Sequence, residues 1–375
     1  MTHKADARRA SLRPVYSGDP SNVTAPSNQG VAAQRWRRRI AIVAAIVLAT
    51  VGLTACGTDE PPTTTPEDRS WEAVVDGAED EGVVNFYSVA PELQNVRLVK
   101  EFNSEYPDIK VRVLRGGGEL PSRVSAEIQS SSKGADVLLF SDPNWFTKNA
   151  DHLMTLEGPE TESWPEQVWR VKGRAIVPSA YPFGMIVWNT DLFPVGFENW
   201  DDLLDPSVKG KFGTRSDVTP SYAGYLDFLE RTMGPTYLPA LGAQEPKFYP
   251  SVVPMTQAVA SGEIGVANTT TPSIVKELQE LGAPIDAVIP PHTYAIEWGA
   301  AAIDGSEHPN AARVFIDFMM SQHGQQALNG DGLGISGRTD IPGVIPQTGM
   351  EMLKSERYPA DVLAEWSRKV DEYLS

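Results

Sequence analysis

Several short motifs in this chain have the residue types and spacing of catalytic or cofactor-binding sites. Gly332–Gly337 has the glycine spacing of a dinucleotide-binding turn, but that turn needs a strand before it, and here a helical pattern precedes it. Ser130 and Lys133 have the spacing of a serine nucleophile and its lysine, without a Lys-Thr-Gly partner. The five histidines lack paired zinc-ligand spacing. We therefore expect no catalytic residue, no metal and no cofactor.

Polar residues suited to binding a solute gather in turns that follow short apolar runs. Ser88–Glu92 follows the run Val83–Tyr87, Gly116–Gly118 follows 109–114, and Ser141 with Asp142 follows 135–140. Ligands of parallel sheets collect at the carboxyl ends of the strands. These turns are therefore candidates for one wall of a binding site.

Two predicted helix starts carry hydroxyl and amide side chains. Thr219–Tyr222 opens one helix, and Asn268–Thr271 precedes another. A helix N-terminus offers unpaired N–H groups and the positive end of the macrodipole, so it can bind an anion. Capping by Thr219 or Ser221 is the structural alternative, and both roles can hold together.

Cys56 is the single cysteine of the chain, so no disulfide is available. The arginines of Arg35–Arg39 precede the apolar run Ile40–Ala55, and the cysteine follows it directly. This run is shorter than the ~20 residues of a membrane-spanning helix and is typical of an export signal. Leu53-Thr54-Ala55-Cys56 resembles the lipobox of bacterial lipoprotein precursors, which implies lipidation of Cys56. An uncleaved signal anchor is the alternative.

The chain beyond the N-terminal segment begins with an extended linker and is acidic overall. The whole sequence has a net charge of −17, although its N-terminal segment is rich in arginine. Such a surface argues against nucleic acid as a partner. The Pro- and Thr-rich stretch from Gly57 to Pro66 has nothing to bury and reads as an extended linker.

Strand-like and helix-like patterns alternate from Trp71 onward. Short apolar runs of strand length are separated by stretches with helical periodicity and short polar turns. This pattern predicts an α/β fold with mostly parallel sheets covered on both faces by helices. The chain after the linker is long enough for two domains.

The order of these motifs resembles the type II periplasmic-binding fold of ABC-importer solute-binding proteins, in the branch of the ferric-binding proteins. The segments that carry the resemblance are 84–88, 116–120, 135–137, 188–191, 200–206, 209–211, 260–263 and 308–318. The resemblance implies a two-lobed protein with a hinge, in which a cleft captures a solute and delivers it to a permease and its ATPase. The implied protein is an extracytoplasmic monomer, lipid-anchored to the outer face of the cell membrane.

The expected domains follow from the resemblance and the N-terminal signals. They are a leader and signal peptide at 1–55, an anchored linker at 56–70, a first lobe at 71–175 continued at 291–340, a second lobe at 176–290, and C-terminal helices at 341–375 that pack on the lobes. The hinge crossings are expected near 175–183 and 289–296. The expected ligand-binding residues are Ser88, Glu92, Gly117, Gly118, Ser141, Asp142, Tyr181, Thr219, Ser221, Tyr222, Asn268, Thr269, Thr270 and Trp298.

The expected ligand is a small polar or anionic solute. Ferric-binding relatives carry adjacent tyrosines at the turn where this chain has Asn268–Thr271. Neutral hydroxyls are poor ligands for a hard trivalent ion. A phosphate, phosphonate, sulfonate or carboxylate suits the helix starts better, with a polyol or ferric ion as alternatives. Asp142 and Glu92 could meet a cationic or hydroxyl-bearing part of the solute. An exported enzyme on the same scaffold and an adhesive lipoprotein are the other functions considered.

Overall fold

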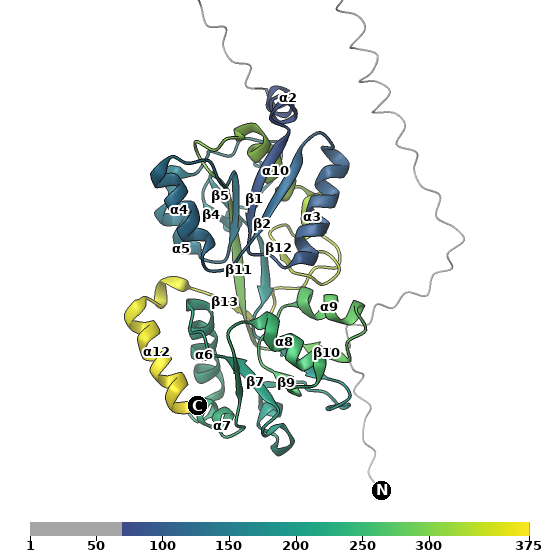
Figure 1. The fold of residues 1–375 in the computed structure, drawn as a ribbon, viewed down its shortest axis with the longest axis vertical. Coiled ribbons are helices and arrows are strands. Elements are labelled where there is room, and N and C mark those ends of the chain that lie inside the picture. Colours follow the sequence, from purple (N-terminus) through teal and green to yellow (C-terminus); the bar gives the residue numbers. More distant parts are fainter. Residues whose placement is uncertain (1–69, 375) are drawn as a thin grey trace, which may run out of the picture. The chain divides into compact units, whose positions relative to one another are not determined.

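The computed structural model describes residues 70–374, which belong to one compact unit. The expected signal peptide, Cys56 and nearly all of the linker lie outside these residues. Two sheets and their helices form two lobes (Figure 1). No helix among residues 70–374 is long and apolar enough to span a membrane.

The first sheet has the strand order β12-β5-β11-β3-β1-β2, with β13 added to β11 and β4 added to β5. The strands of this sheet are β1 Val83–Ser88, β2 Lys110–Arg115, β3 Val137–Phe140, β4 Trp169–Val171, β5 Ala175–Pro182, β11 Thr293–Ala302, β12 Ile335–Ser336 and β13 Met350–Met352.

The second sheet has the order β10-β6-β9-β7-β8. Its strands are β6 Ile186–Asn189, β7 Phe212–Arg215, β8 Lys247–Tyr249, β9 Val266–Ala267 and β10 Ile285–Val288.

The helices of the two lobes follow the strand–helix alternation of the sequence. The α-helices are α2 Trp71–Glu81, α3 Glu92–Glu105, α4 Leu120–Ser130, α5 Pro143–Lys148, α6 Pro220–Met233, α7 Tyr237–Gly242, α8 Val252–Ser261, α9 Pro272–Glu280, α10 Pro309–Met320, α11 Gln322–Asn329 and α12 Ala360–Tyr373. Short 3₁₀ helices cover Ala150–His152, Glu166–Val168, Trp200–Leu204, Pro206–Val208 and Ser355–Arg357.

Side chains of β1 pack alternately into two separate cores of the first lobe. Phe86 packs with Phe102 of α3 and Phe315 of α10 on one face. The next residue, Tyr87, joins the cluster formed with α4 and α5 on the opposite face. Successive side chains of a strand point to opposite faces of its sheet, so both faces of this strand are covered.

The second sheet is covered in the same way. In β6, Val187 packs against Met255 of α8, whereas its neighbours Ile186 and Trp188 pack in the core that contains α6 and α7. The C-terminal helix α12 adds Trp366, Val370 and Leu374 to the α6 core, and Figure 1 shows it beside α6.

The expected two-lobed α/β architecture is confirmed, and its sheets are mixed rather than mostly parallel. Strands β1, β2 and β3 are parallel, as the pattern predicted. Strand β11 returns from the second sheet and runs antiparallel to both β3 and β5. A chain that leaves a sheet and returns through a hinge need not make a parallel crossover, so the pairing becomes mixed.

Candidate functional site

A cavity of about 750 Å³ is lined by residues of both lobes. It is lined by the first lobe through α4 and the end of β3, and by the second lobe through the end of β7 and the starts of α6 and α8. The end of β5 and the segment after β13 complete the wall. The lining residues are Val89, Gly118, Pro121, Ser122, Ser125, Ala126, Gln129, Phe140, Ser141, Asp142, Trp145, Tyr181, Phe183, Arg215, Thr219, Pro220, Ser221, Ser251, Val252, Leu353 and Ser355.

Two helix N-termini of the second lobe reach this cavity. The N-cap of α6 is Thr219, whose Oγ1 accepts a hydrogen bond from the Tyr222 N–H and lies 2.9 Å from the Ser221 hydroxyl. The N-cap of α8 is Ser251, whose side chain makes no capping bond. Both helix starts therefore present hydroxyls and the positive ends of helix dipoles to the cavity.

Arg215 is the basic residue of the cavity wall. It ends β7, is 8% exposed, and its Nε has no hydrogen-bond partner among the described residues. The nearest carboxylate is that of Asp217, 4.0 Å away and 65% exposed. Burial lowers the pKa of Arg215 below its ordinary value, yet a guanidinium stays charged at neutral pH. A long ion pair with an exposed carboxylate compensates a buried cation only in part, so the site favours an anionic ligand.

Aromatic rings hold the Arg215 side chain in place. The guanidinium lies 5.7 Å from the Phe183 ring centroid and 5.4 Å from that of Tyr222, both within the range of cation–π attraction. A side chain held from two sides loses little conformational freedom when it binds a ligand. The geometry therefore presents one pre-oriented cation to the cavity.

Tyr181 supplies an aromatic wall next to this cation. Its ring packs at 5.0 Å against that of Trp298. Burial raises the pKa of Tyr181 to about 12, and the positive charge of Arg215 opposes this shift. The phenol is therefore neutral near pH 7 and can act as a hydrogen-bond donor.

The first lobe contributes neutral hydroxyls and one carboxylate. Asp142 is the N-cap of α5, and its Oδ1 accepts the Asn144 N–H at 3.0 Å. Trp145 donates from its indole nitrogen to Ser125 Oγ at 2.9 Å, which fixes the ring at the cavity wall. The arrangement can bind a polar solute through hydroxyls, one guanidinium and one carboxylate.

The structure brings part of the expected ligand-binding set to this cavity. Gly118, Ser141, Asp142, Tyr181, Thr219 and Ser221 line it. Gly117, beside it in the chain, donates its N–H to Glu119 Oε1 at 2.9 Å and is not part of the lining.

Four other expected residues lie outside the lining for separate reasons. Ser88 is fully buried and bonds Asn95 Oδ1 at 2.7 Å. Glu92 is exposed at the start of α3. Tyr222 is fully buried, with its hydroxyl 2.6 Å from that of Thr214, and Trp298 lies behind Tyr181.

The turn Asn268–Thr270 also lies outside the cavity lining. All three side chains are buried, and Asn268 Oδ1 accepts from Thr214 while the hydroxyl of Thr270 lies 2.8 Å from that of Thr256. The turn is thus tied into the interior of the second lobe. The hydroxyl of Thr269 is buried without a partner among the described residues.

Sequence reasoning missed Arg215 and Ser355. Arg215 ends an apolar strand, the position at which ligands of such sheets are bound, so its place in the strand was an available signal. Ser355 gave no such signal, because it comes from the C-terminal segment and reaches the cavity only through tertiary packing. Ser122, Ser125 and Gln129 also line the cavity from α4, where the apolar periodicity indicated only the core-facing side of the helix.

The described residues hold no cluster of three or more His, Cys, Asp or Glu side chains that could bind a metal ion.

Solved structures share this fold. The substrate-binding protein of an Agrobacterium tumefaciens ABC transporter is 17% identical and has a TM-score of 0.66, with 79% of this chain and 96% of that chain covered. AfuA of Actinobacillus pleuropneumoniae, with fructose-6-phosphate bound, is 19% identical at a TM-score of 0.61, covering 78% and 98%. Iron-bound HitA of Pseudomonas aeruginosa is 20% identical at a TM-score of 0.58, covering 77% and 99%. These levels of identity show a shared fold alone.

Sequence comparison identifies the family. A search among curated proteins finds no match. The model of the bacterial extracellular solute-binding proteins matches residues 92–326, which is more than half of the chain and includes the cavity wall from α4 to α8. The chain therefore belongs to the bacterial extracellular solute-binding protein family.

Proposed function

We propose that this protein is the receptor of an ABC importer that captures a small organic anion in the cavity between its lobes. The observation that carries the proposal is Arg215, a buried guanidinium at the cavity wall whose ion-pair partner, Asp217, is 4.0 Å away and mostly exposed. Charge-assisted hydrogen bonds from a guanidinium are the strong ones, and its fork matches carboxylate and phosphate oxygens. The starts of α6 and α8 add dipoles of the same sign.

The size of the cavity favours an organic solute over a bare ion. A volume of about 750 Å³ lies within the usual range of small-molecule sites, ~300–1,000 Å³. A phosphate, phosphonate, sulfonate or carboxylate group would lie at Arg215. The remainder of the solute would contact Trp145, Tyr181 and Phe183.

The charges at the site disfavour ferric ion. A trivalent cation would lie near the Arg215 guanidinium, which repels it. Burial raises the pKa of Tyr181 to about 12, so the phenolate that a ferric ion binds is harder to form here than at an ordinary tyrosine. An organic anion is therefore the proposed ligand, and ferric ion is the outcome that would contradict it.

The remaining parts of the proposal concern location and partners. We place the protein on the outer face of the cell membrane as a monomer, held by lipid at Cys56 through the linker at 56–70. The two lobes, with boundaries near 175 and 290, would close on the solute and deliver it to a permease and its ATPase. The function is binding without catalysis.

Calorimetry with purified protein tests the ligand class. The panel contains organic phosphates, phosphonates, sulfonates, carboxylates, neutral sugars and ferric citrate. Wild-type protein is expected to bind at least one anion, and Arg215→Gln to weaken it by about tenfold or more, because a hydrogen bond to a charged group contributes about 1.5–3 kcal/mol.

Arg313→Gln is the matched control. The Nε of Arg313 is also buried without a partner among the described residues, but this arginine lies on α10 outside the cavity. It is expected to leave anion binding unchanged. Tight ferric binding with a phenolate charge-transfer band, and none by the anions, would overturn the proposal.

A further inference from the structure

The segment that follows β13 forms a wall of the cavity that neither sheet supplies alone. Strand β13 pairs in parallel with Thr293–Ala295 of β11, and the Leu353 N–H donates to Ala295 O at 2.9 Å. Leu353 and Ser355 then line the cavity. The C-terminal segment therefore does more than pack on the outside of the lobes.

The rest of this segment is fixed to the second lobe. The Tyr358 hydroxyl donates to Asp227 Oδ2 at 2.9 Å, and Lys369 pairs with Glu230 at 2.7 Å. Both acidic partners lie on α6, and Trp366 of α12 packs in the same hydrophobic core as α6. Ser355 is thus held by contacts with the second lobe on its C-terminal side.

Ser355 contacts the first lobe through Asp142. It is 4% exposed, and its hydroxyl donates to Asp142 Oδ1 at 3.4 Å. The usual O–H···O distance is ~2.7–2.8 Å, so this bond is long and weak. The same oxygen already accepts the Asn144 N–H, whereas Oδ2 accepts no hydrogen bond from the described residues. The carboxylate can therefore accept a stronger donor.

The charges of the cavity wall are divided between the lobes. Among the residues that line it, Asp142 is the one acidic side chain and Arg215 the one basic side chain. Asp142 follows β3 of the first sheet, and Arg215 ends β7 of the second. A solute that spans the cavity meets a negative group on one lobe and a positive group on the other.

We propose that the solute carries a hydrogen-bond donor, a hydroxyl or a protonated amine, in addition to its anionic group, and that this donor binds Asp142 in place of the Ser355 hydroxyl. The inference rests on the proposed function, because the anionic group is taken to lie at Arg215. A solute with both groups engages both lobes at once. A simple anion engages Arg215 and leaves Asp142 bonded to Ser355.

Matched pairs of probes test the donor. Glycerol 3-phosphate is compared with propyl phosphate, and 2-aminoethyl phosphate with ethyl phosphate, by calorimetry on the full folded domain. Wild-type protein is expected to bind the donor-bearing member of at least one pair about tenfold or more tightly, as a hydrogen bond to a charged group allows.

Two variants assign the preference to Asp142. Asp142→Asn keeps an oxygen that can cap α5 but removes the negative charge. It is expected to reduce the preference for the donor-bearing probe to about threefold or less, because charge-assisted hydrogen bonds are roughly twice as strong as neutral ones. Ser355→Ala leaves the carboxylate and removes its competitor, so it is expected to keep or increase the preference. Unchanged circular dichroism melting shows that each variant folds.

The outcomes separate this inference from the proposed function. Tight, Arg215-dependent binding of both members of each pair with equal affinity overturns the donor inference and leaves the anion class standing. A preference that persists unchanged in Asp142→Asn also overturns it. Binding by none of the four phosphates, with ferric citrate or neutral sugars bound instead, overturns the anion class itself.

Discussion

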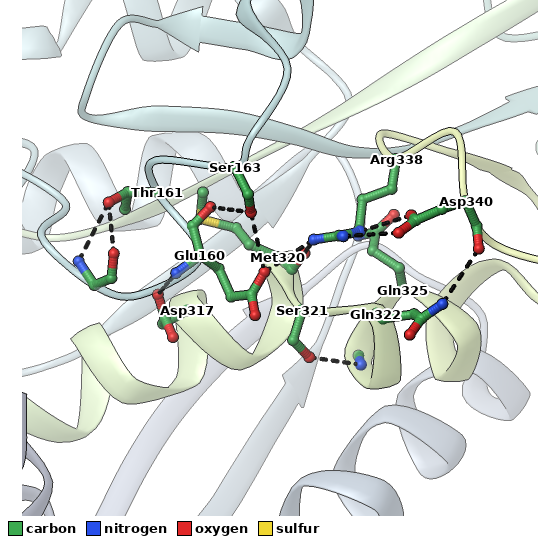
Figure 2. Close-up of polar contacts among 12 residues, drawn as sticks. Glu160, Thr161, Ser163, Asp317, Met320, Ser321, Gln322, Gln325, Arg338 and Asp340 are labelled. Atoms are coloured by element: carbon green, nitrogen blue, oxygen red, sulfur yellow. Dashed lines mark hydrogen bonds and ion pairs between the residues drawn. The ribbon is translucent and has the colours of Figure 1, made fainter.

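Asp317 offers a direct test of how burial controls the stability of the first lobe. It lies on α10, is 8% exposed, and its Oδ1 accepts the Glu160 N–H at 3.0 Å (Figure 2). Burial raises the pKa of Asp317 from 3.8 to about 6, and the negative charges of Glu160 and Glu105 add to the effect. The hydrogen bond from the Glu160 backbone opposes it.

The sign of the effect on stability follows from the raised pKa. Well below pH 3.8 the carboxyl is protonated in both folded and unfolded protein and makes no pH-dependent contribution. As the pH rises towards 6, the unfolded chain loses this proton first, so the free energy of unfolding falls. A shift from 3.8 to about 6 amounts to about 3 kcal/mol at neutral pH, as an upper value.

Asp317→Asn removes the charge and keeps an oxygen that can accept the Glu160 N–H. We expect the free energy of unfolding to rise by up to about 3 kcal/mol at pH 7.5 and to change little at pH 4. Urea unfolding across this pH range, followed by circular dichroism, gives the difference at each pH.

Asp340→Asn is the control with the opposite sign. The hydrogen bond from Arg338 lowers the pKa of Asp340, so its charge favours the folded state at neutral pH (Figure 2). Its substitution should therefore reduce stability slightly, if it has any effect. A loss of stability in Asp317→Asn at pH 7.5, or an equal gain at pH 4 and pH 7.5, would refute the reasoning.

The remaining predictions concern the cavity, the anchor and the hinge. Arg215→Met should raise the free energy of unfolding by about 1 kcal/mol, while anion affinity falls. Removal of a buried charge with one long, exposed ion pair should outweigh the loss of two cation–π contacts, and lower stability in urea unfolding would mark Arg215 as structural. Cys56→Ser should abolish lipid labelling and release the protein from the membrane, and continued labelling would contradict the anchor. Saturation with a bound anion should reduce the radius of gyration in small-angle scattering, and an unchanged value would contradict closure of the lobes.

Local patterns in the sequence were enough to predict the elements of the fold and several of the turns and helix starts that line the cavity. The alternation around Phe86 and the cap at Thr219 depend on neighbouring residues, so they could be read from the chain. The same holds for Asp142, a polar residue at the end of a buried strand that also caps the next helix. The order of such segments was sufficient to indicate the two-lobed architecture and the family.

Only the tertiary structure decided which polar groups face the cavity. Asn268 and Thr270 have the residue types of a binding turn, but Thr214 and Thr256, distant in sequence, take up their polar groups inside the second lobe. Ser355 reaches the cavity from a segment whose pattern indicated packing alone. The direction of a side chain depends on which distant elements satisfy its polar atoms and fill the space around it, because most buried polar groups are hydrogen-bonded. That information lies in long-range packing, which residue spacing does not encode.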